Sequence, residues 1–432
     1  MQRIIIKNFG PIEDIDISIN DIMIFIGPQA SGKSTISKVI YFFKSLKYEL
    51  IKNVMEYVVN NNVENPIGTF SRLVTSKLMA IWGPTQNLSN TYLKYVYKEG
   101  IFIEITIKGT DVTYNFSKVF TQTFWDIINR TKLFSSRQPV RDSKPLSSSE
   151  RISIESERKI FLTEIEWLAN ELFSDERDVI FFPAGRSLLA TFSDQIQIND
   201  INKLDYTMLS FIDRINFSKH IFSQSLTDLA LKIKKVTQVK YGSESLKSAE
   251  DYVSTILKAT YLFDNEGEKL YFSKTGYTKL HYASSGQQEV IWILLFIFQI
   301  IQKNKDFFVV VEEPEAHLYP ETQKDIVDLI CLLSNFRSNQ IIITTHSPYI
   351  LSSFNNLLYA YNVDKRGAPN VEAVVNKQLW INPDRLDAYF VSDGRVESII
   401  DEEFKLIKTE AIDSASRVIN DVYGKLFDLD PE

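Results

Sequence analysis

The sequence predicts an α/β fold in which short buried strands alternate with helices, and three observations carry that prediction. An apolar run at 22–26 is followed by a glycine-containing turn and then by the amphipathic helical pattern of Ser34–Lys47. A strand-like run at 307–311 follows the long apolar helix that opens near Gly286, and a second such run follows at 340–345. Continuous apolar runs of this length are typical of parallel strands covered on both faces.

The remaining elements follow from hydrophobic periodicity and from the positions of Gly and Pro. Strands are predicted at 3–8 and 15–26, on either side of the turn at 9–11, and a hairpin at 102–107 and 112–116. A short buried strand is predicted at 179–182, and strands around Gly276 at 269–282. Helices are predicted over most of 48–95, 152–172 and 200–260.

Length and composition describe an ordinary globular protein. The 432 residues allow one large domain with insertions or two lobes, and the net charge of −7 argues against a uniformly basic nucleic-acid surface. A single cysteine, Cys331, excludes an intramolecular disulfide and fits a reducing compartment. The most apolar segment, 291–301, is too short to span a bilayer. We expect a cytoplasmic protein with no signal peptide and no membrane segment.

The segment 130–151 differs from its surroundings, because it is rich in Ser and Pro and carries six basic residues against two acidic ones. We interpret it as a surface loop. A plain solvated linker and a docking surface for DNA or a protein partner are both compatible with this composition.

The motif that organises the chain is a phosphate-binding loop of the form G-x-x-x-x-G-K-S, directly behind the strand at 22–26. Backbone N–H groups of such a loop and the N-terminus of the following helix attract phosphate oxygens. Lys33 would reach the β- and γ-phosphates, and the Ser34 hydroxyl would hold Mg²⁺. The residues predicted to bind nucleotide here are Gly27, Pro28, Gln29, Ala30, Ser31, Gly32, Lys33, Ser34 and Thr35. An ordinary turn before a core helix is the alternative.

Two carboxylates, Glu312 and Glu313, follow the buried strand at 307–311. The carboxyl ends of parallel strands are where open α/β sheets bind ligands. Glu312 would hold Mg²⁺ through hard oxygen ligation, and Glu313 could orient and deprotonate an attacking water. Solvated acids at a strand end are the alternative.

Two other stretches extend this pattern. His346 follows the strand at 340–345, at the same predicted sheet edge, where an imidazole can contact a γ-phosphate. The small residues Ser284, Ser285 and Gly286, with Gln287, open the long apolar helix and would let an anion approach its N–H groups. An ordinary serine-capped helix explains the second stretch equally well.

In this order the four stretches G27-P-Q-A-S-G-K-S, S284-S-G-Q-Q, E312-E-P-E-A-H-L and T345-H-S-P resemble the Walker A, signature, Walker B and H-loop motifs. They occur in the ABC-type ATPase head of the RecF, SMC and OLD-nuclease group. The resemblance covers about a third of the chain. It implies a P-loop NTPase head with an antiparallel β subdomain and helical insertions, and ATP and Mg²⁺ as cofactors.

The resemblance also implies a head-to-tail homodimer, in which Ser285 and Gly286 of one copy would cap the γ-phosphate held by Lys33 of the other. The chain departs from the family in having Glu312 where Asp is commoner, although the OLD-like branch often has Glu there. No Q-loop glutamine can be placed. Instead, Arg186 follows the strand at 179–182 in a Pro-Ala-x-Arg turn that the OLD-like branch shares. It is a candidate nucleotide or dimer contact, and an arginine paired with an acid is the alternative.

For domain organisation we expect a head over 1–370 and a tail or docking region over 371–432. Within the head the prediction distinguishes an N-terminal lobe at 1–47, an inserted region at 48–178, a helical insertion at 200–262 and a C-terminal lobe at 269–362. No Toprim-like Asp-x-Asp on a strand is evident, since Asp428 and Asp430 lie at the end of the sequence.

Three functions are compatible with these residues. The first is an ATPase whose ATP-bound dimer or larger oligomer regulates a separate effector, probably a nuclease, as in anti-phage systems such as Septu or PARIS. The second is a RecF-like repair ATPase that binds DNA directly. The third is an oligomeric scaffold that ATP holds together with little hydrolysis. A transporter ATPase is disfavoured, because transporters usually carry LSGGQ where this chain has S-S-G-Q-Q.

Overall fold

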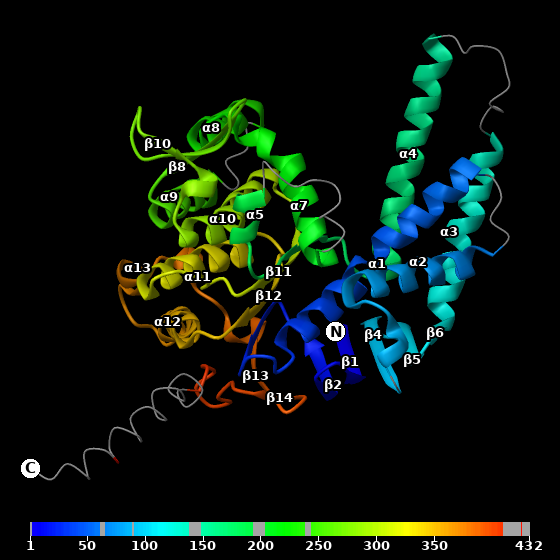
Figure 1. Cartoon of the computed structure of the whole chain (residues 1–432), viewed down its shortest axis with the longest axis horizontal. Coiled ribbons are helices and arrows are strands. Elements are labelled where there is room, and N and C mark those ends of the chain that lie inside the picture. The colour runs from blue at the N-terminus through cyan, green and yellow to red at the C-terminus, as the bar shows by residue number, and fades with distance from the viewer. Residues whose placement is uncertain are drawn as a thin grey trace, which may run out of the picture. The chain divides into compact units, whose positions relative to one another are not determined.

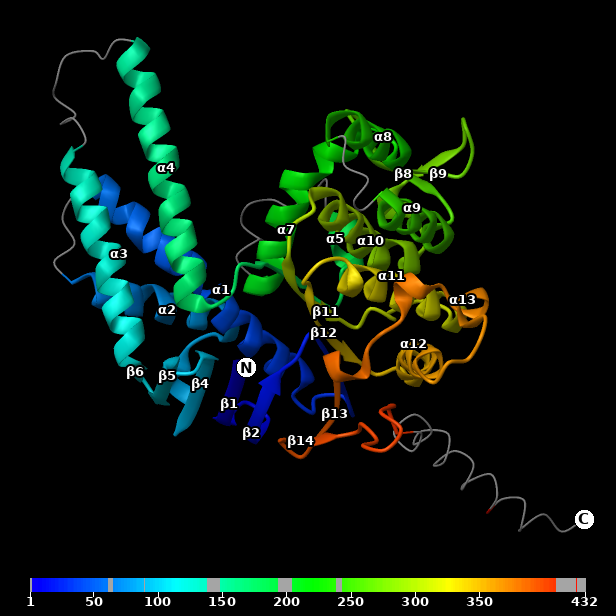
Figure 2. The same cartoon turned by 180° about the vertical axis from the view of Figure 1, so that it is seen from behind.

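A computed structural model describes residues 2–60, 65–88, 90–137, 148–192, 204–237 and 243–408, together with Lys425. The chain divides into two compact units, each assembled from segments that are distant in the sequence (Figures 1 and 2). Unit 1 comprises Met1–Ile19, Lys38–Val179 and Asp393–Arg395. Unit 2 comprises Asn20–Ser37, Ile180–Ser392 and Val396–Glu432.

Unit 1 is built on a five-stranded antiparallel sheet in the order β2-β1-β4-β5-β6. Side chains alternate across it, and the four isoleucines at every second position of β5 are buried. The predicted hairpin around Gly109 is confirmed by the pairing of β5 with β6. The strands are β1 (Gln2–Phe9), β2 (Ile12–Ile19), β4 (Thr91–Lys98), β5 (Ile101–Lys108) and β6 (Asp111–Phe116).

The helices of unit 1 include α1, whose first residues belong to unit 2 and whose remainder belongs to unit 1. A buried ionic cluster ties α1 to the segment after α4: Lys44 pairs with Asp175, and Lys47 Nζ donates to the carbonyl of Arg177 at 2.6 Å. Burial lowers the pKa of Lys44 to about 8, and the Asp175 carboxylate opposes this shift. The helices are α1 (Lys33–Asn60), α2 (Pro66–Trp82), α3 (Lys118–Arg137) and α4 (Ser148–Phe173), with a 3₁₀ turn at Thr85–Asn87.

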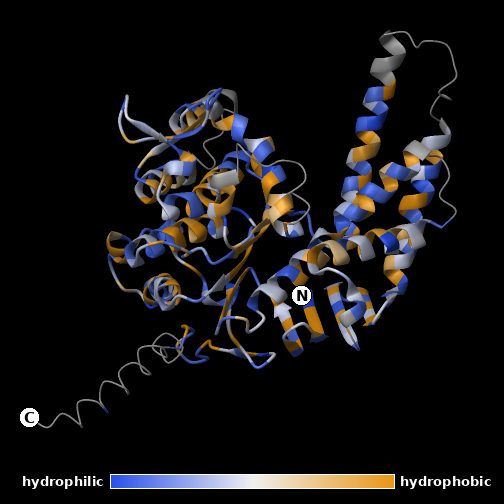
Figure 3. Cartoon of the chain, in the orientation of Figure 1, coloured by the Kyte–Doolittle hydropathy of each residue, from blue (hydrophilic) through white to orange (hydrophobic). Residues whose placement is uncertain are grey.

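Unit 2 contains most of a six-stranded sheet in the order β14-β13-β3-β12-β11-β7. Neighbours among β13, β3, β12 and β11 pair in parallel. Every residue of β3, β11 and β12 is buried, which explains the apolar runs at 22–26, 307–311 and 341–343 within them (Figure 3). The strands are β3 (Ile22–Ile26), β7 (Asp178–Phe182), β11 (Phe307–Glu312), β12 (Gln340–Thr345), β13 (Leu386–Ser392) and β14 (Arg395–Ser398).

The central helix of unit 2 is α10 (Ser285–Lys303), in which every residue from Glu289 to Ile301 is buried. A small three-stranded sheet in the order β10-β9-β8 confirms the predicted strands around Gly276. The other elements are α5 (Ser187–Phe192), α7 (Tyr206–Ser218), α8 (Leu226–Thr237), α9 (Ser243–Leu257), β8 (Thr260–Asp264), β9 (Gly267–Tyr271), β10 (Tyr277–Lys279), α11 (Pro320–Asn335), α12 (Pro348–Lys365) and α13 (Val371–Val374), with 3₁₀ turns at Lys219–Ser223, Leu280–Tyr282, Lys377–Leu379 and Pro383–Arg385.

This topology confirms the predicted α/β fold with an antiparallel sheet and inserted helices around a phosphate-loop core. Within the described ranges, no helix combines the length and the apolar character that crossing a bilayer requires.

Three sequence predictions need correction. The single strand expected at 15–26 is two strands, β2 and β3, which belong to different sheets. The break falls at Asn20, whose carbonyl accepts a hydrogen bond of 2.8 Å from Gln340 Nε2. Consequently the N-terminal lobe expected at 1–47 is divided between the two units.

The second correction concerns the tail expected from residue 371. Its residues 386–392 form β13, which pairs with β3 and so belongs to the central sheet. The third concerns the basic loop at 130–151, because α3 continues to residue 137 and α4 begins at 148. The rest of that loop, 138–147, lies outside the described residues, as do 409–424 and 426–432.

Candidate functional site

The phosphate loop, the paired carboxylates and His346 follow three neighbouring parallel strands at their C-terminal ends, and we call this place the strand-end site. Ile26, the last residue of β3, pairs with Thr345, the last residue of β12. Glu312, the last residue of β11, pairs with Thr344. Gly27, Glu313 and His346 are therefore the first residues beyond three neighbouring strands. The sheet register itself brings the phosphate loop, the paired carboxylates and the histidine together.

The phosphate loop depends on a glycine at its first position. A Cβ added to Gly27 would lie 2.2 Å from the carbonyl oxygen of Val391 on β13. Gly32 and Ala30 also have positive φ angles, of 107° and 61°. The loop thus passes close to β13 in a conformation that larger side chains at Gly27 would prevent.

Lys33 lies inside this loop. Its Nζ donates to the carbonyls of Gly27 at 2.9 Å and Pro28 at 2.7 Å, and the residue is 5% exposed. Burial lowers the pKa of Lys33, whereas the nearby carboxylates of Glu313 and Glu315 act in the opposite direction. A buried ammonium at a helix N-terminus is suited to a phosphate group. The residues present therefore fit the phosphate groups of a nucleoside triphosphate.

The rest of the loop is open to solvent. Pro28, Gln29, Ala30 and Ser34 are exposed, while Ser31 and Thr35 are half-buried. Ser34 follows Lys33 in the first turn of α1. Its hydroxyl and the carboxylate of Glu312 are hard oxygen ligands of the kind that Mg²⁺ takes beside phosphates.

The two adjacent carboxylates have different surroundings. Glu312 is 4% exposed, and its Oε2 accepts a hydrogen bond of 3.3 Å from the backbone N–H of Ala184. The Glu313 side chain is 39% exposed. Its backbone has a φ of 46° and donates a hydrogen bond of 2.8 Å to the Thr344 carbonyl. Glu312 is thus fixed in the protein, and Glu313 faces solvent from an uncommon backbone conformation.

His346 lies beside Glu313. The two side chains are equally exposed, and His346 Nε2 is 3.8 Å from Glu313 Oε1. The predicted general base and the predicted γ-phosphate contact are therefore neighbours at the open edge of the sheet.

Arg186 is 1% exposed, and its side chain is hydrogen-bonded to protein groups. Its guanidinium donates to the backbone carbonyls of Glu312 at 2.7 Å, Glu313 at 3.0 Å and Glu289 at 2.8 Å. The Glu289 carboxylate accepts hydrogen bonds from the backbone N–H groups of Arg186 and Ser187, each at 3.0 Å. Burial lowers the pKa of Arg186, and the carboxylates of Glu289 and Glu312 oppose this. The alternative interpretation, an arginine paired with an acid, describes this geometry.

The signature turn forms a capping box at the start of α10. Ser284 Oγ accepts from the backbone N–H of Gln287 at 3.4 Å, and Gln287 Oε1 accepts from the backbone N–H of Ser284 at 3.3 Å. The Gln287 amide also donates to the Leu257 carbonyl at 2.8 Å. Ser284 and Ser285 are exposed. The serines are thus available to a ligand, whereas the Gln287 side chain holds the turn together.

Position 286 requires a glycine for a steric reason. A Cβ at this position would lie 2.8 Å from the carbonyl oxygen of His317. The signature turn therefore packs directly against the loop that follows Glu313. One buried residue of this region, Glu289, was given no role by sequence reasoning. For Glu289 the available signal was a charged residue at the start of an otherwise apolar helix.

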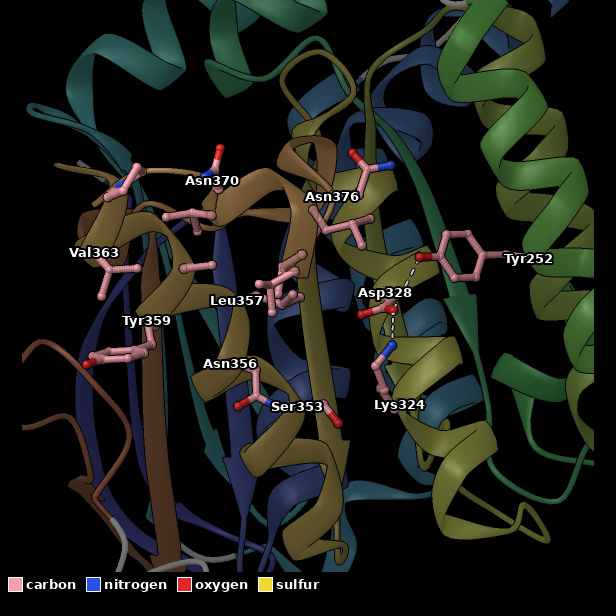
Figure 4. A pocket seen from close by; sticks show the side chains of 16 residues that line it. Tyr252, Lys324, Asp328, Ser353, Asn356, Leu357, Tyr359, Val363, Asn370 and Asn376 are labelled. Atoms are coloured by element: carbon pink, nitrogen blue, oxygen red, sulfur yellow. Dashed lines mark hydrogen bonds and ion pairs between the residues drawn. The ribbon is translucent and has the colours of Figure 1, made fainter. Parts of the chain in front are cut away.

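A separate cavity of about 650 Å³ lies in unit 2 among α9, α11, α12 and α13 (Figure 4). At one end, Asp328 accepts hydrogen bonds from Lys324 at 2.6 Å and from the Tyr252 hydroxyl at 3.2 Å. None of the predicted site residues lines this cavity. It is therefore distinct from the strand-end site.

Comparisons with known proteins identify the kind of domain that the chain contains. A family model described as an AAA ATPase domain matches residues 1–351. The OLD nuclease of Thermus scotoductus is 21% identical over 358 residues, which are 81% of this chain and 59% of that protein. The lipoprotein-releasing system ATP-binding protein LolD of Neorickettsia sennetsu is 25% identical over 95 residues, which are 22% of this chain and 40% of that protein.

The chain therefore spans less than two thirds of the length of these curated relatives. Among solved structures, an SMC head bound to the C-winged helix domain of ScpA aligns with 93% of this chain and 97% of that chain. The sequence identity is 13% and the TM-score is 0.41.

Proposed function

We propose that the chain binds and hydrolyses ATP at the C-terminal ends of its parallel strands. The chain belongs to the AAA ATPase domain family. The observation that carries this proposal is the arrangement at the strand-end site. Lys33 lies within the phosphate loop, where the negative charges of Glu313 and Glu315 act to raise its pKa. Glu313 Oε1 lies 3.8 Å from His346 Nε2. A phosphate-binding cation, a solvent-facing carboxylate and an imidazole together suit hydrolysis of a terminal phosphate.

Each residue of the site has a role that fits its burial and its position. Lys33 and the N–H groups of the loop bind the β- and γ-phosphates. Ser34 and the buried Glu312 would hold Mg²⁺, which when bound neutralises developing phosphate charge. Glu313, being accessible to water, orients and deprotonates the nucleophile, and His346 contacts the γ-phosphate region.

We further propose that a second copy of the chain completes each site. Ser285 and Gly286 of that copy would donate to the γ-phosphate from the N-terminus of α10. The exposure of Ser284 and Ser285 supports this, since the capping box leaves them at the surface. Closing the pair would remove water from the phosphates and strengthen every polar contact there.

The biological role rests on the family resemblance alone. We propose that the ATP-bound dimer or larger oligomer regulates a separate effector in bacterial anti-phage defence, with a nuclease as the effector. One curated relative is itself named a nuclease. Protection from phage or toxicity produced by this chain alone, without any neighbouring gene product, would contradict this role.

The test of the ATPase proposal combines turnover with mass. The purified chain should hydrolyse ATP in the presence of Mg²⁺, and its mass by light scattering should rise when ATP is added. Lys33→Ala should lose nucleotide binding, turnover and the mass increase together, because the loop loses its cation. An ATP-dependent mass increase without turnover would instead favour a scaffold. ATP-dependent retention of DNA that declines steeply with salt would favour a RecF-like activity.

A further inference from the structure

Glu315 joins the loop after β11 to the loop after β12. Its Oε1 accepts two hydrogen bonds of 2.7 Å, one from the Thr345 hydroxyl and one from the backbone N–H of His346. One carboxylate oxygen thus fixes both the last residue of β12 and the backbone of the histidine itself.

The two loops are connected at further points on either side of Glu315. The backbone N–H of Glu313 donates to the Thr344 carbonyl at 2.8 Å. Gln323 Nε2 donates to the Leu318 carbonyl at 3.0 Å, and Gln323 Oε1 accepts from the Ser347 hydroxyl at 2.6 Å. The segment 313–318 is therefore attached to 344–347 along its length, and the Glu315 side chain accepts the hydrogen bond from the backbone N–H of His346.

The second oxygen of Glu315 has an uncommon environment. Oε2 is buried and has no hydrogen-bond partner among the described residues. Burial raises the pKa of Glu315, and the neighbouring Glu313 carboxylate acts in the same direction. Leaving a carboxylate oxygen buried without a partner costs free energy, whereas the two bonds to Oε1 require only an oxygen acceptor at that position.

We propose that Glu315 is a positioning residue for ATP hydrolysis, which holds His346 against Glu313 and touches neither nucleotide nor metal. This rests on the proposed ATPase function. The distance of 3.8 Å between His346 Nε2 and Glu313 Oε1 depends on where the backbone of His346 lies, and Glu315 sets that position. A displacement of about 1 Å in such a site can lower turnover about a hundredfold.

The first test compares Glu315→Ala, Glu315→Gln and the control Glu321→Gln, an exposed glutamate on α11. In Glu315→Ala we expect kcat to fall at least about tenfold, with the Kd for ATP nearly unchanged, since the phosphate loop is intact. Glu315→Gln keeps an oxygen acceptor at Oε1 and should recover most of kcat. A fully active alanine variant, or a glutamine variant as inactive as alanine, would overturn the proposal.

The second test is a double-mutant cycle with His346→Ala. If Glu315 acts through His346, removing both side chains should cost no more in kcat than His346→Ala alone. Losses that simply add would contradict that coupling. If Glu315→Ala fails to fold by thermal unfolding, Thr345→Val replaces it: this variant keeps the side-chain shape and removes one of the two donors, and unchanged kcat would overturn the proposal.

Different results would contradict the ATPase proposal and the positioning role of Glu315. If the wild-type chain with ATP and Mg²⁺ shows no turnover, the ATPase proposal and the role of Glu315 both fail. If the wild type is active and the Glu315 and Thr345 variants match it in kcat, only the positioning role fails.

Discussion

Replacing Glu313 with Gln should lower ATP turnover at least about a hundredfold, because an amide cannot take the proton of the attacking water. ATP-dependent assembly should persist. The change keeps the shape of the side chain and leaves the backbone hydrogen bond to Thr344 in place. Lys33 and the rest of the phosphate loop are also unaltered. The variant should therefore remain trapped in the ATP-bound assembly that the wild type leaves after hydrolysis.

The measurement is steady-state phosphate release together with light scattering, on wild type, Glu313→Gln and the control Glu372→Gln. Glu372 is an exposed glutamate on α13, outside the strand-end site. The control should match the wild type in both assays. A Glu313→Gln variant with normal phosphate release would assign the general base to another group.

Replacing Arg186 with Met should destabilise the chain by about 3–5 kcal/mol, the usual result of removing one partner of a buried ion pair. Glu289 would keep its buried carboxylate without the guanidinium beside it. Four backbone carbonyls, those of Pro183, Glu289, Glu312 and Glu313, would also lose a charged donor.

Denaturant unfolding of the intact chain measures this loss. Arg130→Met is the matched control, because Arg130 pairs with Glu164 at the surface, where such pairs contribute about 1 kcal/mol or less. The same free energy of unfolding for the Arg186 variant and the wild type would contradict the structural role. An Arg186 variant with normal stability but weaker binding of ATP would instead support the nucleotide contact that the sequence suggests.

Much of the site could be predicted because its residues follow strands that can be recognised from the local sequence alone. The strands before Gly27, Glu313 and His346 are buried on both faces, and their C-terminal ends can be read from the sequence. Once those strands are parallel neighbours, their C-terminal residues must meet at one edge. The phosphate loop adds a motif whose spacing has a physical reason.

The rest depends on contacts between distant parts of the chain. No local pattern shows that β13 pairs with β3 or that Val391 limits the size of the residue at position 27. Arg186 precedes Glu289 by about a hundred residues, and only the fold brings them together. Glu315 was visible in the motif, but its link to His346 became evident only from hydrogen-bond geometry.

The central claim is that two copies of the chain share each nucleotide, one supplying Lys33 and the other Ser285. Mixing a Lys33→Ala variant with a Ser285→Arg variant tests it most directly. Neither variant alone should hydrolyse ATP. A mixed dimer contains one intact composite site out of two, so turnover should recover to at most about half of the wild-type value. A mixture that is no more active than its separate components would contradict the claim.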